Sequence, residues 1–219
     1  MNQDTLKQQV GHAALPFVKD GMMVGVGTGS TTRYFMEALA SIKDRIAGTV
    51  ASSIQTEKLL KSLGIPVFSL LEVDQIDLYV DGADEVDTHG RLIKGGGAAL
   101  TREKILSFAA KKFVCIVDKS KQVSVLGKFP VPVEVIPMAR SIVAKAICSL
   151  GGDPVYRAGV TTDNGNVLLD IHRLQLTDPQ MVETKLNQIP GVVCNGIFSF
   201  QTPQVVLVGS EKGVSQINF

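Results

Sequence analysis

Two glycine-rich segments and an acidic segment between them carry the residues best suited to chemistry. These segments are Gly25-Val-Gly-Thr-Gly-Ser-Thr31, Asp81-Gly-Ala-Asp-Glu85 and Lys94-Gly-Gly-Gly97. Each glycine segment follows an apolar run typical of a strand and precedes a run typical of a helix. Backbone N–H groups and the positive end of a helix dipole at such a junction suit a phosphate or another anion. We therefore predict chemistry on a small phosphorylated molecule.

The first glycine segment differs from the common nucleotide-binding motifs. Ser30 stands where a dinucleotide fingerprint has its third glycine, and the absence of Gly-Lys-Ser/Thr excludes a P-loop. The hydroxyls of Ser30 and Thr31 can cap the following helix and can also donate to a ligand. A tight turn with an N-cap would explain one glycine and one serine, but not three alternating glycines. We therefore favour an anion site over a plain turn.

The acidic segment places three carboxylates, those of Asp81, Asp84 and Glu85, within five residues. Their mutual repulsion suggests a purpose. One alternative is a divalent metal site, and the other is hydrogen bonding to sugar hydroxyls with proton transfer. Nearby histidine ligands in regular spacing would strengthen the metal alternative, but only His89 is available; it lies in a polar turn and is given no role. We favour sugar handling and expect neither a metal ion nor a cofactor.

The second glycine segment is costly to order, because three consecutive glycines lose much backbone freedom. They allow a backbone to approach a ligand closely, and Lys94 adds a compact positive charge. A flexible loop with a solvated lysine is the alternative. Lys119 and Lys121 flank Ser120 after a later apolar strand, where one of them could complete a phosphate site, although solvated lysines are the default there.

Glu103 lies on the helix expected after the second glycine segment, at the border of its apolar stripe. Partial burial there would raise the pKa of the carboxyl, as a general base working near neutral pH requires. Arg102 falls within the same arc, so an ion pair is also open. On helix periodicity alone, an ordinary surface glutamate is the more common outcome.

The elements that must position these residues alternate between apolar strands and amphipathic helices. We expect strands at 22–26, 49–52, 66–70, 76–80, 92–94 and 113–117, and helices at 6–18, 31–46, 55–63 and 98–112. Such alternation predicts a parallel sheet covered on both faces, which binds ligands beyond the carboxyl ends of its strands. Residues 27–31 and 81–84 both follow strands, so we expect them at the same edge.

The pattern changes near Pro130. We expect a strand at 131–136, a helix at 138–150, strands at 154–161 and 167–172 around an Asn164-Gly165 turn, a helix at 179–189 after the N-cap Asp178, and a strand at 192–198. This order is that of a ferredoxin-like unit. A strand at 204–208 could return to the first sheet. We therefore predict an α/β fold with a Rossmann-like, mostly parallel sheet in residues 1–129 and 200–219, and a small ferredoxin-like α+β domain in residues 130–199.

Composition narrows the class of protein. The 219 residues carry a net charge of +1 that is scattered along the chain, which argues against a nucleic-acid or membrane-surface partner. The first residues lack the features of a signal peptide, and no apolar run approaches a membrane span. Three cysteines, far apart and among apolar neighbours, favour a reducing compartment without disulfides. We expect a cytoplasmic globular protein.

Four motifs in one order resemble the ribose-5-phosphate isomerase A family. They are Gly25-Val-Gly-Thr-Gly-Ser-Thr31, Tyr79-Val-Asp-Gly-Ala-Asp-Glu85, Ile93-Lys-Gly-Gly-Gly-Ala-Ala-Leu-Thr-Arg-Glu-Lys104 and Phe129-Pro-Val-Pro-Val-Glu-Val-Ile-Pro137. The resemblance covers nearly the whole chain, including the hairpin Thr162-Asp-Asn-Gly-Asn166. It implies an enzyme that interconverts ribose 5-phosphate and ribulose 5-phosphate in the non-oxidative pentose phosphate pathway, without a metal, as a homodimer or homotetramer.

The resemblance also implies residue roles. A proton would move between C1 and C2 through a cis-enediolate, with Glu103 as the proton acceptor. Lys94 would stabilise the developing oxyanion, and Asp81 or Asp84 would assist ring opening, with the choice between them left open. The hydroxyls of Ser30 and Thr31 are expected near the phosphate, with Lys94 nearer the reacting oxygens. The implied substrate-binding residues are Thr28, Gly29, Ser30, Thr31, Asp81, Gly82, Ala83, Asp84, Lys94, Gly95, Gly96, Gly97 and Lys121.

Two other classes of protein share parts of this pattern. A non-catalytic sugar-phosphate sensor could use a related fold, although no basic helix-turn-helix candidate precedes Leu6. An acyl-CoA transferase could also use it, with a nucleophilic glutamate and a larger adenine pocket. An isomerase assay separates these alternatives.

Overall fold

The computed structural model describes residues 3–219, and contacts along the chain divide it into two units. The first unit contains the residues up to Ala83 together with Arg102–Lys121 and Pro203–Phe219, and the second contains Asp84–Thr101 and Gln122–Thr202. This division assigns 84–101, 122–129 and 200–202 to the second unit, unlike the sequence-based domain boundaries at 129/130 and 199/200. Those boundaries stay a prediction.

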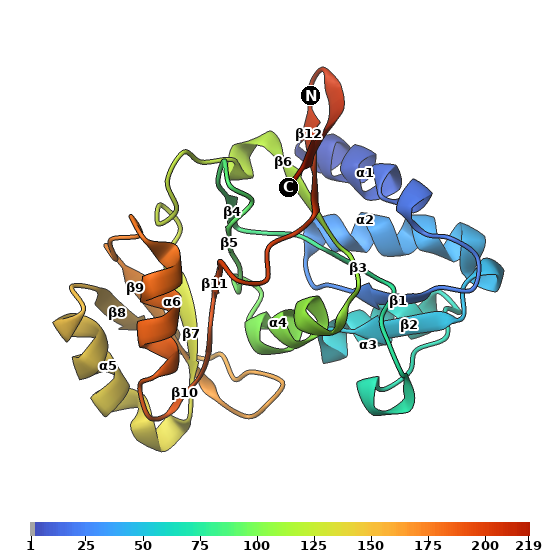
Figure 1. Ribbon diagram of the computed structural model, residues 1–219. Helices are drawn as coiled ribbons and strands as arrows, with labels where there is room; N and C mark the ends of the chain where they lie inside the picture. The colour runs from blue at the N-terminus through green and yellow to red at the C-terminus, as the bar shows by residue number, and fades with distance from the viewer. Residues whose placement is uncertain (1–2) are drawn as a thin grey trace. The chain divides into compact units, whose positions relative to one another are not determined.

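A six-stranded sheet forms the centre of the first unit (Figure 1). Its strands are β1 (Met23–Val26), β2 (Gly48–Ala51), β3 (Leu78–Asp81), β6 (Phe113–Asp118), β12 (Val205–Ser210) and β13 (Gly213–Asn218). The order is β13-β12-β6-β3-β1-β2, and all neighbours are parallel except β12 and β13. The chain therefore turns back between β1 and β3, and their carboxyl ends are the topological switch point where such sheets bind ligands.

The helices of this unit cover both faces of the sheet. They are α1 (Gln3–Ala13), α2 (Ser30–Leu39), α3 (Ile54–Ser62) and α4 (Leu100–Ala109), with short 3-10 turns η1 (Leu15–Phe17), η2 (Ala40–Arg45), η3 (Leu70–Glu72) and η4 (Lys119–Lys121). Figure 1 shows α1 and α2 on one side of the sheet and α4 on the other. No helix within residues 3–219 is long and apolar enough to cross a membrane.

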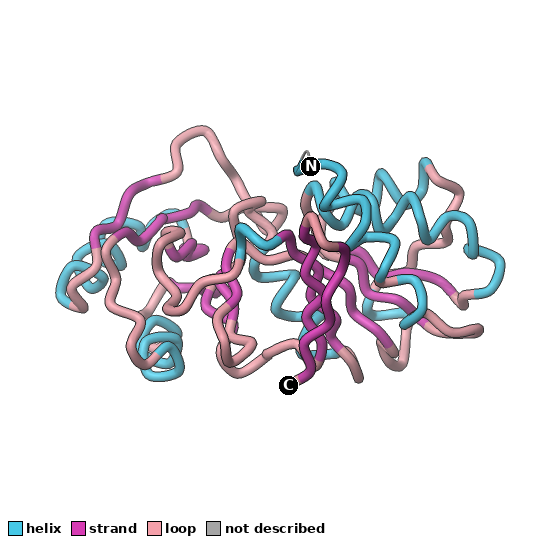
Figure 2. The backbone as a smooth tube through the Cα atoms, turned by 90° about the horizontal axis from the view of Figure 1, so that it is seen from above, coloured by secondary structure: helices cyan, strands magenta, loops and turns pink. Residues whose placement is uncertain are grey.

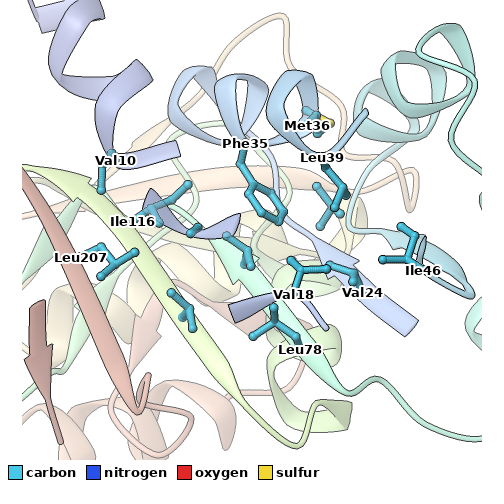
Figure 3. Packing of buried hydrophobic residues seen from close by; sticks show 14 of the residues in the cluster. Val10, Val18, Val24, Phe35, Met36, Leu39, Ile46, Leu78, Ile116 and Leu207 are labelled. Atoms are coloured by element: carbon cyan, nitrogen blue, oxygen red, sulfur yellow. The ribbon is translucent and has the colours of Figure 1, made fainter. Parts of the chain in front are cut away.

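The core of the first unit follows from alternation along the strands. Val24, Leu78 and Ile116 face the same side of the sheet, where Phe35 and Leu39 of α2 pack on them (Figure 3). Successive strand residues point to opposite faces, so these positions bury one face as a continuous apolar layer. This core fixes the register of β1 and β3, and with it the relative positions of the loops at their carboxyl ends.

The expectations for this unit were largely confirmed, with three corrections. The expected strand at 66–70 is absent: Val67 forms only an isolated bridge with Thr49, and Ser69 already caps η3 in a capping box with Glu72. The expected helix at 31–46 is helical only to Leu39 and then tightens into η2. The antiparallel strand β13 was not expected, and the C-terminus lies at its end (Figure 2).

The second unit has the predicted order of elements. It comprises β7 (Val131–Val135), η5 (Pro137–Ala139), α5 (Arg140–Ser149), β8 (Asp153–Tyr156), β9 (Val167–His172), α6 (Pro179–Asn187) and β10 (Val192–Asn195). The strands form an antiparallel sheet of order β10-β7-β9-β8, the ferredoxin-like arrangement. Asp178 caps α6 as expected, since its side chain accepts from the Met181 N–H at 3.1 Å.

A separate three-stranded sheet completes the second unit, and it corrects the expected strand at 192–198. Its strands are β4 (Glu85–Val86), β5 (Leu92–Ile93) and β11 (Ile197–Phe198), in the order β11-β5-β4. Gly196 divides β10 from β11, because the Gly196 N–H donates to the Pro132 carbonyl while the Gly196 carbonyl accepts from the Lys94 N–H. A Cβ at Gly196 would lie 2.2 Å from the Lys94 carbonyl oxygen, so the crossing requires glycine.

Candidate active site

The first glycine segment connects β1 to α2 and lies beside the end of β3, as predicted. The Gly27 N–H donates to the Val80 carbonyl at 2.9 Å, and the Thr28 N–H donates to Asp81 Oδ1 at 3.2 Å. A Cβ added to Gly27 would lie 1.8 Å from that same oxygen. The glycine therefore makes room for the Asp81 carboxylate.

Asp81 is fully buried at the end of β3, and both of its oxygens are engaged. Oδ1 accepts from the N–H groups of Thr28 and Gly82, the latter at 2.7 Å, and Oδ2 accepts a short hydrogen bond from the Tyr79 hydroxyl. Burial, reinforced by the negative charges of Asp81 and Glu103, raises the pKa of Tyr79 well above its usual 10.0. The phenol is therefore a permanent donor to Asp81.

A cluster of hydroxyls that the sequence analysis missed holds Thr28 from the other side. The Thr28 Oγ1 lies 2.7 Å from Ser52 Oγ, 2.8 Å from Ser53 Oγ and 3.1 Å from Thr56 Oγ1. Ser53 is the N-cap of α3, and the Thr56 hydroxyl donates to the Gly27 carbonyl at 2.9 Å. A serine pair directly after a strand, with threonine at the third helical position, was the available signal.

The hydroxyls of Ser30 and Thr31 do not cap α2, which was one of the two uses that the sequence left open for them. Gly29 is the N-cap residue, with a φ of 138°, and no side chain caps the helix. The Thr32 hydroxyl donates to the Gly29 carbonyl at 2.8 Å. Among residues 3–219, the Ser30 and Thr31 hydroxyls have no hydrogen-bond partner. Both stand in the first turn of α2, where helix N–H groups lack intrahelical acceptors.

Glu103 is buried on α4, with 3 % of its surface exposed, so the surface position favoured by helix periodicity is wrong. Its charge acts on the phenol of Tyr79, so it lies in the same electrostatic environment as Asp81. Lys121 is half-buried at the end of η4. Burial would raise the pKa of the neighbouring Asp118, but hydrogen bonds from Ser120 and Gln3 and the charge of Lys121 hold it below its usual value.

In the second unit, Asp84 holds the second glycine segment. Its Oδ2 accepts from the Gly96 N–H at 2.8 Å, and its own N–H donates to the Ile93 carbonyl at 2.8 Å. Glu85, by contrast, is buried and accepts from the N–H groups of Gly127 and Phe129 at 2.7 and 2.6 Å. Glu85 therefore anchors the chain after η4, and the apparent cluster of three carboxylates consists of separate binding groups.

Lys94 is not a solvated lysine, because only 2 % of its surface is exposed. Its N–H donates to the Gly196 carbonyl at 2.9 Å, and its Nζ lies 5.7 Å from the centroid of the Phe198 ring. A cation over an aromatic face is favourable and keeps the side chain ordered. The second glycine segment therefore starts from an ordered, buried cation.

Within residues 3–219, no group of three or more His, Cys, Asp or Glu side chains is arranged to hold a metal ion, so the structure adds no support for a metal site. His89 is mostly exposed, and its N–H completes a turn around the buried Asp87. The cysteines at 115, 148 and 194 are free thiols.

Comparison with known proteins agrees with this arrangement. The family model described as ribose 5-phosphate isomerase A (phosphoriboisomerase A) matches residues 48–213. The ribose 5-phosphate isomerase A of Neisseria gonorrhoeae has 44% sequence identity and a TM-score of 0.97, over 99% of this chain and 97% of that chain. The enzyme of Methanocaldococcus jannaschii has 41% identity and a TM-score of 0.95, over 100% of both chains. The Plasmodium falciparum ribose 5-phosphate isomerase has 31% identity and a TM-score of 0.93, over 99% of both chains.

The family assignment rests on the matched length as well as on identity, because the chain spans essentially the whole of these relatives. It also agrees with the order of motifs and with the α/β fold. The chain belongs to the ribose 5-phosphate isomerase A family and interconverts ribose 5-phosphate and ribulose 5-phosphate in the pentose phosphate pathway.

Proposed function

We propose that Glu103 carries the proton between C2 and C1 of the sugar phosphate during isomerisation. In the aldose-to-ketose direction its carboxylate removes the C2 proton, and the electron pair of that bond forms the C1–C2 double bond of a cis-enediolate. The glutamic acid then returns the proton to C1, while the O2 hydroxyl proton passes to O1. The burial of Glu103 supports this role, because a carboxylate shielded from water is a stronger base.

We propose that Ser30, Thr31 and Lys121 bind the phosphate. The hydroxyls of Ser30 and Thr31 stand in the first turn of α2, whose N–H groups and dipole favour an anion. Lys121 supplies a positive charge from η4 in the same unit. Lys94 and the N–H groups of Gly95 and Gly97 then act on the oxygens at C1 and C2, where negative charge develops, while the Gly96 N–H is held by Asp84.

Of the two candidate carboxylates, we assign ring opening to Asp84. Asp81 is fully buried, and its two oxygens already accept three hydrogen bonds that hold the first glycine segment. Asp84 is only half-buried and accepts one hydrogen bond, from the Gly96 N–H. A half-buried carboxyl can exchange a proton with the ring oxygen of a bound furanose, whereas Asp81 serves to position Thr28 and Gly82.

The ligand of a relative is consistent with a small phosphorylated substrate. A D-ribose-5-phosphate isomerase with 41% identity was solved in complex with phospho-erythronic acid. We propose that the same class of ligand, a short polyhydroxylated acid bearing a phosphate, binds to this chain as well. The cytoplasmic location and the homodimeric or homotetrameric state are also proposals, which cell fractionation and sedimentation velocity test.

Turnover of ribose 5-phosphate by the purified protein, with and without a chelator, tests the proposal. Activity that survives the chelator agrees with metal-free proton transfer, whereas activity lost to the chelator and restored by a divalent ion contradicts it. Glu103→Gln is expected to fold and to lower kcat by about 10²–10⁴-fold, the usual contribution of one acid–base group. Glu37→Gln on α2, which breaks only an exposed pair with Arg33, is the matched control and should retain activity. Near-normal turnover by Glu103→Gln would remove Glu103 from this role.

A further inference from the structure

Arg157, which no motif singled out, holds the backbone of the second glycine segment. It follows β8, and its guanidinium forms a two-pronged pair with Asp170 of β9: Nε to Oδ2 at 2.8 Å and Nη2 to Oδ1 at 2.5 Å. The two side chains are 18 % and 16 % exposed, so the pair is largely shielded from water. Paired along one edge, the planar guanidinium has a fixed orientation.

The remaining nitrogen of this guanidinium reaches the glycine segment. Nη1 donates to the Gly95 carbonyl at 3.1 Å and to the Gly96 carbonyl at 3.2 Å. Both carbonyls therefore point toward the same group, although glycine backbones are the least restricted of all. The Gly95 carbonyl also accepts from the Ala98 N–H at 3.0 Å, whereas Arg157 is the donor that holds the Gly96 carbonyl.

These bonds determine where the N–H groups of the segment point. In a planar trans peptide, the N–H lies opposite to the carbonyl. The Gly95–Gly96 peptide is clamped on both sides, by Arg157 at its carbonyl and by Asp84 at its N–H. In the Gly96–Gly97 peptide, Arg157 holds only the carbonyl, and the Gly97 N–H on the opposite side hydrogen-bonds to nothing within residues 3–219.

The far end of the segment is anchored as well. The buried Glu134 of β7 accepts a short hydrogen bond from Thr101, in the first turn of α4. Its other donors are Thr162, Asn164 and Asn166 of the β8–β9 loop, at 2.8, 3.1 and 2.8 Å. Because both ends are fixed, a change at Arg157 should affect the conformation of the glycines more than the fold.

We propose that Arg157, held by Asp170, is a positioning residue that aims the Gly97 N–H at the oxyanion of the enediolate. Arg157 does not touch the substrate and acts only through the Gly95 and Gly96 carbonyls. This inference rests on the proposed role of the Lys94–Gly97 segment in stabilising the reacting oxygens. It assigns a catalytic purpose to the β8–β9 strands of the ferredoxin-like sheet.

Steady-state kinetics of Arg157→Ala test the proposal. Misplacing a group by about 1 Å can cost about 10²-fold and removing one oxyanion donor costs about 10²–10³-fold, so we expect kcat to fall by about 10²-fold. The KM should change by less than about threefold, since the phosphate is assigned to Ser30, Thr31 and Lys121, and so uniform binding is retained. Guanidinium ion at millimolar concentration should restore part of kcat, a response that a merely structural role would not give. An unchanged kcat, or a fall in kcat that guanidinium leaves untouched, overturns the inference.

Two further variants make the outcome specific. Arg173→Ala removes an exposed Arg–Asp pair of the same unit, formed at 2.7 Å with Asp153 of β8, and should leave kcat and its response to guanidinium unchanged. Lys94→Ala tests the proposed function itself: if it retains full activity, the segment is not part of the site. A large loss for Lys94→Ala with none for Arg157→Ala refutes the positioning role alone.

Should Arg157→Ala fail to fold, Asp170→Asn provides the milder variant. It keeps one acceptor oxygen but loosens the grip on the guanidinium, so kcat should fall in the same direction by a smaller factor. Thermal unfolding of each variant reports folding independently. A folded Asp170→Asn protein with normal kcat counts against the proposal.

Discussion

In each of the two glycine segments, an aspartate carboxylate accepts a hydrogen bond from a backbone N–H, but the two aspartates have different surroundings. In the first, Asp81 accepts the Thr28 N–H, and Gly27 leaves the space that the carboxylate fills. In the second, Asp84 accepts the Gly96 N–H, and a Cβ on Gly96 would lie 2.7 Å from the other Asp84 oxygen. Asp81, however, is fully buried beside Tyr79 in the sheet, whereas Asp84 is half-buried.

We infer from this difference that Asp81 mainly holds the fold of its unit, whereas Asp84 is free to take part in turnover. The first segment is bound by strand carbonyls, a buried carboxylate and a hydroxyl cluster, so its conformation is part of the fold of the first unit. The second is bound by side chains that come from the loops and edges of its own unit, with Arg157 and Asp84 on either side of one peptide. Changes at Gly27 or Asp81 should therefore mainly lower stability, and changes at Gly96 or Asp84 should mainly lower kcat.

The strongest test substitutes alanine for the glycine beside each aspartate. Gly27→Ala would force a methyl group to within 1.8 Å of a buried carboxylate, so we expect a loss of at least about 1–3 kcal/mol in the free energy of unfolding. In Gly96→Ala the added methyl group meets the end of the half-buried Asp84 side chain, which can move, so stability should change by less than about 1 kcal/mol. The substitution should nevertheless lower kcat, because Asp84 must move away from the Gly96 N–H.

Urea unfolding and steady-state kinetics measure both effects. Gly82→Ala serves as a matched control for stability in the acidic segment, since a Cβ there meets only the Ile116 carbonyl oxygen, at an ordinary 3.6 Å. Equal losses of stability for Gly27→Ala and Gly96→Ala would break the comparison.

The second test removes the charge from each aspartate. Asp81→Asn replaces an acceptor of three hydrogen bonds inside the sheet, and a hydrogen bond to a buried charge contributes about 1.5–3 kcal/mol. We expect Asp81→Asn to lower stability by an amount in that range. Asp84→Asn should unfold like the parent protein and should slow turnover of the closed furanose by about 10²–10⁴-fold, as expected for the loss of one acid–base group.

Measuring turnover in both directions, from the ring-closed ribose 5-phosphate and from the open-chain ribulose 5-phosphate, distinguishes a role of Asp84 in ring opening from a general loss of activity. Ribulose 5-phosphate cannot close to a furanose, because its C5 oxygen carries the phosphate. Since the proposed step is ring opening, kcat with ribulose 5-phosphate should fall less in Asp84→Asn than kcat with ribose 5-phosphate. Loss of stability in Asp84→Asn, or full activity with both substrates, would contradict this assignment.

Local sequence patterns predicted the parts of this molecule that depend on near neighbours in the chain. The alternation of apolar strands with helices predicted the parallel sheet. The Asn164-Gly165 turn marked the connection between β8 and β9, although the expected strand at 154–161 already ends at Tyr156. The expected edge shared by Gly27–Thr31 and Asp81 was confirmed, because parallel strands end on the same side. The strand expected at 66–70 failed because Ser69 and Glu72 favour a capped turn there.

The remaining parts depend on contacts between residues distant in sequence. Periodicity put Glu103 at the edge of an apolar stripe, yet its burial depends on how α4 packs in the first unit. The hold of Arg157 on Gly95 and Gly96 joins residues about sixty positions apart, and no local pattern marks it. The sequence suggested that Asp81, Asp84 and Glu85 form one cluster, but each carboxylate accepts hydrogen bonds from N–H groups in a different part of the chain.

The smallest expected effect concerns Tyr79, whose hydroxyl donates to Asp81 and so helps to hold the first glycine segment. Neither β4 nor β5, the strands beside Asp84 and the second segment, contains a tyrosine that could do the same. Burial and the charges of Asp81 and Glu103 raise the pKa of Tyr79 well above 10.0, so the folded protein retains this proton where the unfolded chain releases it. The resulting stabilisation is therefore complete below pH 10.0 and is lost as the pH rises further.

Folded parent protein, with three tyrosines and no tryptophan, should show the same tyrosinate absorbance change as Tyr79→Phe. An additional tyrosine should then titrate only when the parent protein unfolds in alkali. A larger absorbance change in the folded parent protein than in Tyr79→Phe would mean that the phenol ionises in place, and that Asp81 is less firmly held than the comparison requires.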